Sequence, residues 1–410
     1  MTRTIPVILS SAAVALGLAL PAFGQAPAPA PEKKFLTKDG SRPTGLFAPG
    51  VAVGKTVYVA GKGDYRPDAD LSEKVKNCLG EIRKTLQAGG LDLKHVVKSF
   101  VYLEDSSQYA EFNKHYGEFF PENPPARTTL GVAAVPGESR LEITCIAYSD
   151  LDERKQIGTP PAGFPYSPGI LAGDTLYVSG KGDQLPDKTH PATFEEQFRQ
   201  TMKNVQTTLN QAGLDFKNVV MSHVFLDDSK NLEVANKVYK EFFAEGDEPA
   251  CATVFVDWIP GGSHSEVTCI ATTKLEGRKV VRPSDVKHGL AEGSVAASPG
   301  VWAGPTLYLS ALAGSKTPGA DAKADLDAQI HQVAKDQVRV LDAAGLKLED
   351  IVSGYVYLRE MKDYDALNAI YRQYFSKGPG VRTCLTPNSK AEQGDIRVRA
   401  SFIAAKTRQP

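Results

Sequence analysis

The residues best suited to chemistry are an arginine and a glutamate fifteen positions apart. Arg127 and Glu142 each stand at the head of an apolar, β-branched run that is typical of a strand. A planar guanidinium binds a carboxylate through two parallel hydrogen bonds, which fixes its orientation as well as its charge. A glutamate beside the bound molecule could orient a water or move its proton. The pair therefore suits hydrolysis of a small molecule that carries a carboxylate.

The chain contains this arrangement three times, and the copies differ in what they keep. In the second copy Cys251 stands where the arginine stood, whereas Glu266 keeps the glutamate. The third copy restores the arginine as Arg382 but has Arg399 in place of the glutamate. Activity therefore depends on which copies retain the pair.

The repeat extends well beyond these two positions. The phrases QAGGLDLKHVVKSFVYLED, QAGLDFKNVVMSHVFLDD and DAAGLKLEDIVSGYVYLRE recur with periods of 123 and 132 residues, measured between Leu91, Leu214 and Leu346. Such a period is too long for a solenoid repeat, so each copy is predicted to be a domain. We place the domains at residues 35–150, 162–275 and 293–408, with linkers near 150–162 and 275–293, where charges, Pro and Gly gather.

Within one copy the pattern predicts a hairpin, a helix, a strand, a second helix and two strands, an α+β unit. In the first copy Val75, Leu79, Ile82 and Leu86 recur at helical spacing, and Gly89-Gly90 ends that helix. Two helices cover one face of the predicted sheet, so the other face must be buried against something else. Three copies in one chain can bury it against each other. We therefore expect an intramolecular pseudo-trimer with three clefts between copies, in a protein that is otherwise monomeric.

Composition excludes several classes of partner. The 410 residues carry a formal net charge of -1 and 42% hydrophobic residues, with a pI near 6.7. Nucleic-acid binders usually carry a basic surplus, so no nucleic-acid partner is expected. Five cysteines and seven histidines show no metal-ligand spacing, and Cys145 and Cys269 lie in apolar strands as predicted buried free thiols. No metal site is expected.

The N-terminus is predicted to be an export signal over residues 1–24. Arg3 precedes an apolar run from Ile5 to Phe23, and the sequence QAPAPAPEKK follows. A membrane anchor is the alternative, but the run is short for a spanning helix and is rich in Ala and Ser. We expect a soluble, exported protein, periplasmic or secreted, with no membrane contact after cleavage.

Taken together, the motifs resemble those of the Rid family of reactive-intermediate deaminases. The hairpin ending in Ser-Gly, the AGL turn into a buried strand, the helix with Asn before an aromatic end and the closing PAR…EI..IA carry the likeness, three times over. The resemblance implies trimeric proteins with a chorismate-mutase-like fold and a ligand site between subunits. It also implies hydrolysis of small carboxylated enamines or imines to 2-keto acids and ammonia, without a cofactor.

The resemblance also implies site residues, which we assign by position. The carboxylate-binding arginine matches Arg127 and Arg382, and the water-positioning glutamate matches Glu142 and Glu266. The remaining matches are Tyr166, the pair Ser179 and Gly180, and the asparagines Asn113, Asn236 and Asn368. No single copy holds the whole set. The tyrosine position is Phe47 and Ala297 in the other copies, and the Ser-Gly pair reads Ala60-Gly61 and Ser310-Ala311.

The losses are complementary, which leads to one hypothesis for the active cleft. We expect it between the first and second copies, with Arg127 and Glu142 as catalytic residues facing Tyr166 and Ser179. Gly180, Asn113, Asn236 and Arg382 are predicted to bind substrate.

Simpler interpretations stay open. Arg127 could pair with a carboxylate across the interface, and Glu142 could be an ordinary strand-edge glutamate. The protein could also be a non-catalytic binder of small carboxylates, or a scaffold with degenerate clefts. The family's older ribonuclease names do not fit the neutral charge or the lack of a histidine pair.

Overall fold

A computed structural model of the chain describes residues 1–2, 30–287, 293–390 and 395–408. The predicted export signal falls almost wholly outside this part of the chain. In the described residues no helix is long and apolar enough to cross a membrane. All five cysteines are buried and free, as the apolar strand context of Cys145 and Cys269 predicts.

Each copy forms one six-stranded mixed sheet with two helices, so the predicted α+β class is confirmed. The first copy contains β1 (Lys33–Phe35), β2 (Gly50–Val53), β3 (Thr56–Gly63), α1 (Leu71–Gln87), β4 (Val96–Leu103), α2 (Tyr109–Phe119), β5 (Ala126–Gly131) and β6 (Leu141–Tyr148). The second contains β7 (Arg154–Ile157), β8 (Gly169–Ala172), β9 (Thr175–Val178), α3 (Phe194–Gln211), β10 (Val219–Leu226), α4 (Leu232–Tyr239), β11 (Ala250–Phe255) and β12 (Ser265–Thr272). The third contains β13 (Lys279–Val281), β14 (Gly300–Ala303), β15 (Thr306–Ala313), α5 (Ala322–Ala343), β16 (Ile351–Leu358), α6 (Tyr364–Tyr374), β17 (Val381–Leu385) and β18 (Val398–Ala405).

The strand order is the same in all three sheets. In the first it is β1-β2-β3-β6-β4-β5, with β4 and β5 parallel and the other neighbours antiparallel. The predicted linkers differ from the structure, because β7 and β13 lie inside them and pair with β8 and β14. Each segment between copies therefore adds one edge strand to the sheet that follows it.

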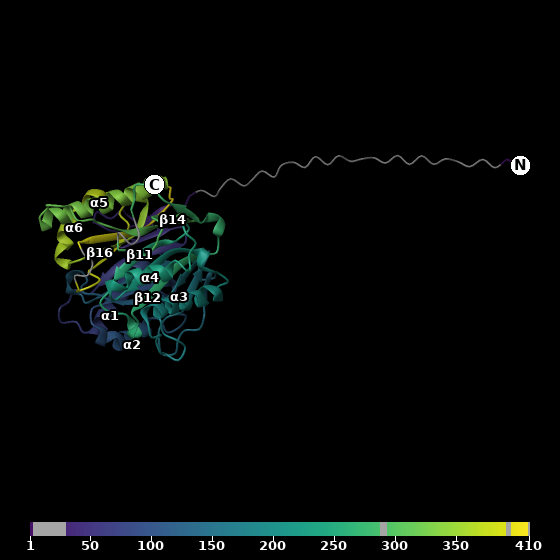
Figure 1. Cartoon of the computed structure of the whole chain (residues 1–410), viewed down its shortest axis with the longest axis horizontal. Coiled ribbons are helices and arrows are strands. Elements are labelled where there is room, and N and C mark those ends of the chain that lie inside the picture. The colour runs from purple at the N-terminus through teal and green to yellow at the C-terminus, as the bar shows by residue number, and fades with distance from the viewer. Residues whose placement is uncertain (3–29, 288–292, 391–394, 409–410) are drawn as a thin grey trace.

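Helix α1 shows why the predicted helices form. Asp70 accepts a hydrogen bond from the backbone N–H of Glu73, and Glu73 reaches back to the N–H of Asp70, which completes a capping box. The apolar stripe that includes Val75 and Leu79 faces the sheet and is fully buried. In Figure 1, α5 and α6 lie at the top of the molecule and α1 and α2 at the bottom, with strands such as β16 and β11 between them.

The inner faces of the three sheets pack against one another around a pseudo-threefold axis. Phe100, His223 and Tyr355 occupy the same position of β4, β10 and β16 and contact one another in a ring. Their ring centroids are 5.3, 5.6 and 5.8 Å apart. One central core contains residues of all three copies, and three outer cores lie between each sheet and its helices. The predicted pseudo-trimer is confirmed.

Equivalent backbone hydrogen bonds join the copies at three seams. Ser167 N–H donates to the carbonyl of Pro125 (3.0 Å), Ser298 N–H to Pro249 (3.0 Å) and Ala48 N–H to Gly380 (2.9 Å). Each bond runs from the second residue before a hairpin to the residue that precedes the edge strand β5, β11 or β17 of the neighbouring copy. These edges are therefore covered rather than exposed.

His223 is the polar member of the axial ring and offers a test of the central core. It is 4% exposed, its Nε2 has no partner, and burial lowers its pKa to about 3, with the Lys98 charge as a second cause. Replacing it by Phe, the residue of the first copy, should raise the free energy of unfolding at pH 7 by about 0.5–2 kcal/mol. The variant is measured by denaturant unfolding.

The pH dependence supplies the control. Because the folded-state pKa lies below the ordinary value, the unfolded chain takes up a proton between about pH 6.5 and 3, and wild-type stability is lost as the pH falls through that window. At pH 4 the advantage of His223→Phe should grow by about 3 kcal/mol. Equal acid sensitivity of the two proteins would contradict this account.

Candidate active site

Arg127 is fixed at the seam between the first and second copies by its own backbone. It lies on edge strand β5, and its N–H donates to Ser179 Oγ (2.8 Å), while its carbonyl accepts from Gly180 N–H (3.0 Å). The Ser179 hydroxyl in turn donates to the carbonyl of Ser167 (2.6 Å) and is completely buried. Both hydrogen-bonding functions of Ser179 are therefore used inside the protein, so it positions Arg127 rather than facing the cavity.

The Arg127 guanidinium is buried without a direct ion pair to a carboxylate of the described residues. It is 3% exposed, and its Nη2 donates to Asn113 Oδ1 (2.6 Å). The rings of Phe112, Tyr116 and Tyr166 surround it, with centroids 4.9 to 5.5 Å from Cζ. Nη1 has no hydrogen-bond partner, and among the described residues no carboxylate forms an ion pair with Arg127. A buried, unpaired cation is costly in free energy, and such groups gather at functional sites.

A cavity of about 620 Å³ opens beside this guanidinium. Residues from the first copy (Arg127, Asn113, Tyr109, Thr129) and from the second (Tyr166, Phe164, Gly180, Gln184, Lys188, Ser263, Glu266) line it together. Thr129 Oγ1 is buried, lines the cavity and has no partner. Burial raises the pKa of Tyr166 to about 12, so its phenol stays a hydrogen-bond donor at neutral pH.

The glutamate in this cleft is Glu266 of the second copy. Its carboxylate lies against Gly180, where an added Cβ would come within 1.7 Å of Glu266 Oε1. Burial raises its pKa from 4.5 to about 7, against the opposing charges of Lys98, Arg127 and Lys181. Around neutral pH the group is therefore poised between its two protonation states, as suits a residue that takes and returns a proton.

The prediction that Glu142 faces Arg127 is wrong. Glu142 lies in the seam between the third and first copies, where a Cβ added to Gly61 would come within 1.9 Å of it and where it lies beside the backbone of Cys384 of the third copy. Burial raises its pKa to about 8, opposed by Arg382 and Lys62. Arg127 and Glu142 share a copy and a sequence motif, but they belong to different clefts.

The strand order explains why Arg127 lies beside Glu266 of the next copy rather than beside Glu142 of its own. Glu142 lies on β6 next to β3, which carries the Ser-Gly position, whereas β4 separates β6 from β5 and Arg127. The tyrosine, the Ser-Gly pair and the glutamate therefore stay together at one end of the sheet, and the arginine points into the seam at the other. In a ring, each arginine meets the glutamate of the next copy. Glu266 is recognisable in the sequence as the glutamate of the second copy, but its place beside Arg127 follows from the pairing of β9 with β12, which the structure shows.

Arg382 lies in the second of the three clefts. Its Nη2 donates to Asn368 Oδ1 (2.8 Å) and Tyr364 Oη (3.0 Å), and its Nη1 has no partner. The ring of Phe47 lies 5.0 Å from its Cζ where Arg127 has Tyr166, so the phenol hydroxyl is missing. Ala60 replaces the serine that holds the Arg127 backbone. This cleft keeps the arginine and Glu142 but loses two supporting groups.

The third cleft is filled by the protein itself, which corrects the prediction for Asn236. Asn236 Oδ1 accepts from Ala296 N–H (2.7 Å), where the other two asparagines hold an arginine. Val295 N–H donates to Thr253 Oγ1 (3.2 Å), and Val295 and Ala297 join the hydrophobic core around Cys251. Asn236 therefore binds the backbone of the third copy. It is remote from the cleft between the first and second copies, called the complete cleft because it contains the arginine, the tyrosine, the serine and the glutamate.

Glycine and glutamate change together among the copies. Gly61 lies against Glu142 and Gly180 against Glu266 because only a residue without Cβ leaves room for the carboxylate. The third copy has Ala311 where these copies have glycine and Arg399 where they have glutamate. The glycine of the Ser-Gly pair is thus a steric requirement of the buried glutamate.

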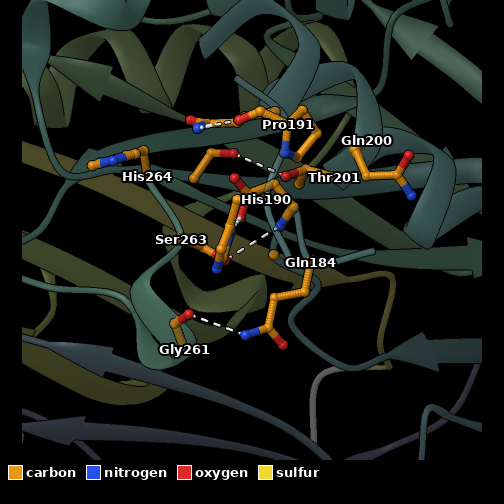
Figure 2. A network of polar contacts seen from close by, with 12 residues as sticks. Gln184, His190, Pro191, Gln200, Thr201, Gly261, Ser263 and His264 are labelled. Atoms are coloured by element: carbon orange, nitrogen blue, oxygen red, sulfur yellow. Dashed lines mark hydrogen bonds and ion pairs between the residues drawn. The ribbon is translucent and has the colours of Figure 1, made fainter. Parts of the chain in front are cut away.

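The rim of the complete cleft is held by a polar network, shown in Figure 2. Gln184 Nε2 donates to the Gly261 carbonyl (3.0 Å), and Asp183 N–H donates to Ser263 Oγ (3.3 Å). His190 Nδ1 lies 3.0 Å from Asp183 Oδ1. The network joins the loop after β9 to the loop before β12. Strand β12 carries Glu266.

A second hollow, of about 690 Å³, lies on the outer face of α5 beside Tyr374. Its His331 contacts Tyr374 Oη, and its Arg339 pairs with Asp285 and Asp336, so these groups already have partners. Within the described residues no cluster of His, Cys, Asp and Glu could hold a metal ion.

Comparison with known proteins identifies the family. The chain belongs to the endoribonuclease L-PSP family, whose profile matches residues 38–149, 157–273 and 294–393. The Rid resemblance is therefore confirmed, with three tandem copies. A RutC family protein of Saccharolobus solfataricus is 35% identical over 119 residues, 28% of this chain and 94% of that protein. A 2-iminobutanoate/2-iminopropanoate deaminase of Mus musculus is 37% identical over 123 residues, 29% of this chain and 90% of that protein.

Among solved structures, a chorismatase matches most of the chain. It covers 76% of this chain and 93% of its own, with a TM-score of 0.53 and 12% identity. At this identity the likeness shows the fold alone.

The contact between Gly180 and Glu266 yields a stability prediction. Gly180→Ala places a methyl group where Glu266 Oε1 now lies, so it should lower the free energy of unfolding by about 1–3 kcal/mol through overpacking. Gly80→Ala is the control, because Gly80 lies within helix α1 with nothing within 4 Å of an added Cβ. It should stabilise the protein by about 0.5–1 kcal/mol. Unfolding curves that move in the same direction would contradict the steric argument.

Proposed function

We propose that the cleft between the first and second copies hydrolyses small carboxylated enamines and imines to 2-keto acids and ammonia. The observation that carries the proposal is the Arg127 guanidinium, buried and with Nη1 unpartnered, beside a cavity that also contains the Glu266 carboxylate. The alternative that Arg127 serves only to pair with a carboxylate of the protein lacks such a partner among the described residues.

The carboxylate of the substrate would bind Arg127. Each charge-assisted hydrogen bond of this kind contributes about 1.5–3 kcal/mol. The rings of Tyr116, Phe112 and Tyr166 exclude water from the guanidinium and hold its plane, so the substrate would be oriented as well as bound. Thr129 Oγ1 and the Tyr166 hydroxyl are further hydrogen-bonding groups on the cavity wall.

Glu266 would supply the proton transfers. A water molecule attacks the imine carbon, a C–O bond forms, and the ionised carboxylate accepts the proton that the water loses. The nitrogen is then protonated, the C–N bond breaks, and ammonia leaves as the carbonyl forms. General base catalysis of this kind contributes about 10²–10⁴ in rate. All atoms come from the imine and water, so the reaction requires no cofactor.

The deaminases among the relatives support this substrate class. Their names specify 2-iminobutanoate and 2-iminopropanoate, small carboxylates with the functional group that the cavity suits. We also infer from the N-terminal sequence that the protein is exported, so the imine would have to form outside the cytoplasm or reach it there.

Matched arginine variants test which cleft works. With 2-iminopropionate generated in situ, Arg127→Ala should lower kcat/KM by about 10²–10⁴, because two charge-assisted bonds are lost. Arg382→Ala should retain more than half of the wild-type rate at pH 7, because its cleft lacks the tyrosine and serine. Likewise, Glu266→Gln should lower kcat/KM strongly, whereas Glu142→Gln should retain most of the wild-type rate at pH 7. Wild-type turnover that survives Arg127→Ala would instead favour a carboxylate-binding protein without catalysis in this cleft.

The pH profile tests the role of Glu266. Because the ionised carboxylate is the base and its pKa is about 7, kcat/KM should fall as the pH drops through about 7. Any activity that remains in Glu266→Gln would come from the cleft of Arg382, where the pKa of Glu142 is about 8, so its acid limb should lie about one unit higher. Identical limbs in wild type and variant would show that the two glutamates do not control them.

A further inference from the structure

Lys98 is a completely buried lysine at the seam that forms the complete cleft. It is 1% exposed, and its Nζ donates to three acceptors: Thr128 Oγ1 (2.7 Å), Val178 O (2.8 Å) and Thr268 Oγ1 (2.8 Å). The first acceptor lies in its own copy and the other two in the second copy. One ammonium thus joins β4 and β5 of one sheet to β9 and β12 of the next.

Each acceptor adjoins a residue of the site. Thr128 follows Arg127, and Val178 precedes Ser179, whose hydroxyl holds the Arg127 backbone. Thr268 lies two residues after Glu266 on β12, so both side chains point to the same face of the strand, about 7 Å apart along it. The ammonium therefore lies behind the cleft, within electrostatic reach of the carboxylate.

Only this seam has the lysine. The same position is Met221 in the second copy and Ser353 in the third. Each of the two glutamates has one lysine and one arginine at equivalent positions. These are Lys62 and Arg382 for Glu142, and Lys181 and Arg127 for Glu266. The extra cation beside Glu266 is Lys98, and it accompanies the lower of the two glutamate pKa values, about 7 against about 8.

The lysine and the glutamate stabilise each other's charged form. Burial lowers the pKa of Lys98 to about 7, and the Glu266 charge opposes that shift, with Cys269 as a smaller contribution and Lys181 acting in the other direction. His223 is also within electrostatic reach of the ammonium, and its lowered pKa keeps it neutral at pH 7. Three oxygen acceptors around Nζ also favour the protonated lysine, which has three N–H donors.

We propose that Lys98 is a positioning residue of the complete cleft: its ammonium, held by three acceptors that adjoin Arg127, Ser179 and Glu266, favours the ionised form of the Glu266 carboxylate that accepts the proton. The inference rests on the proposed function, since it assigns Glu266 the role of base. Lys98 does not line the cavity and acts on the reaction only through these neighbours.

Lys98→Met tests the proposal, because Met221 shows that the fold accepts methionine at this position. Loss of the charge should move the acid limb of kcat/KM upward by about one pH unit. The rate at pH 7 should fall by about three- to tenfold, whereas the rate at pH 9 should stay within about twofold of wild type. Lys98→Gln removes the same charge while keeping hydrogen-bonding groups, and it serves if the methionine variant does not fold. Lys114→Met, which removes an exposed cation from the same copy, should leave the limb in place.

A titration independent of turnover separates this proposal from the proposed function. The carboxyl carbon of Glu266, assigned in ¹³C-glutamate spectra by its loss in Glu266→Gln, should titrate about one unit higher in Lys98→Met. An active wild type whose pH limb and Glu266 titration are both unmoved by Lys98→Met, or whose rate falls equally at every pH, overturns the role of Lys98 and leaves the deaminase standing. An inactive wild type whose Glu266 titration shifts overturns the deaminase and retains the electrostatic link.

Discussion

The structure of this site depends on one buried guanidinium that forms no direct ion pair with a carboxylate of the described residues. Arg127 is enclosed by three aromatic rings, bonded to one asparagine oxygen, and left with a free donor at the wall of a cavity. Its position is set by backbone bonds across a seam, so neither copy could build the site alone. Burying the inner faces of three sheets around one axis is what forces the edge strand of one copy against the hairpin of the next.

Much of the fold could be predicted because its signals are local or repeated. Helical spacing, the caps of α1 and the landmarks of the three copies predict the elements, and a sheet with one uncovered face predicts the ring. The strands β7 and β13 were missed, because three- or four-residue edge strands in polar segments have no alternation strong enough to distinguish them from linkers.

The site was predicted in part. The residue types were recognised, but the grouping of Arg127 with Glu142 followed the motif along the chain, whereas the cleft is built from opposite ends of neighbouring sheets. Asn236 was equivalent in sequence yet lies where the backbone of residues 294–297 occupies the cleft. Lys98 carries no motif, since its importance arises from contacts between copies that a linear pattern does not encode.

The closed third cleft shows what joining three copies in one chain permits. In a symmetric trimer of separate chains, a cysteine at the arginine position would appear in every cleft at once and abolish all of them. Here Cys251 affects one cleft, where Val295 and Ala297 pack into the same core as Cys251. Covalent linkage thus lets one part of the ring become pure scaffold while another retains its chemistry, so the three interfaces can evolve independently.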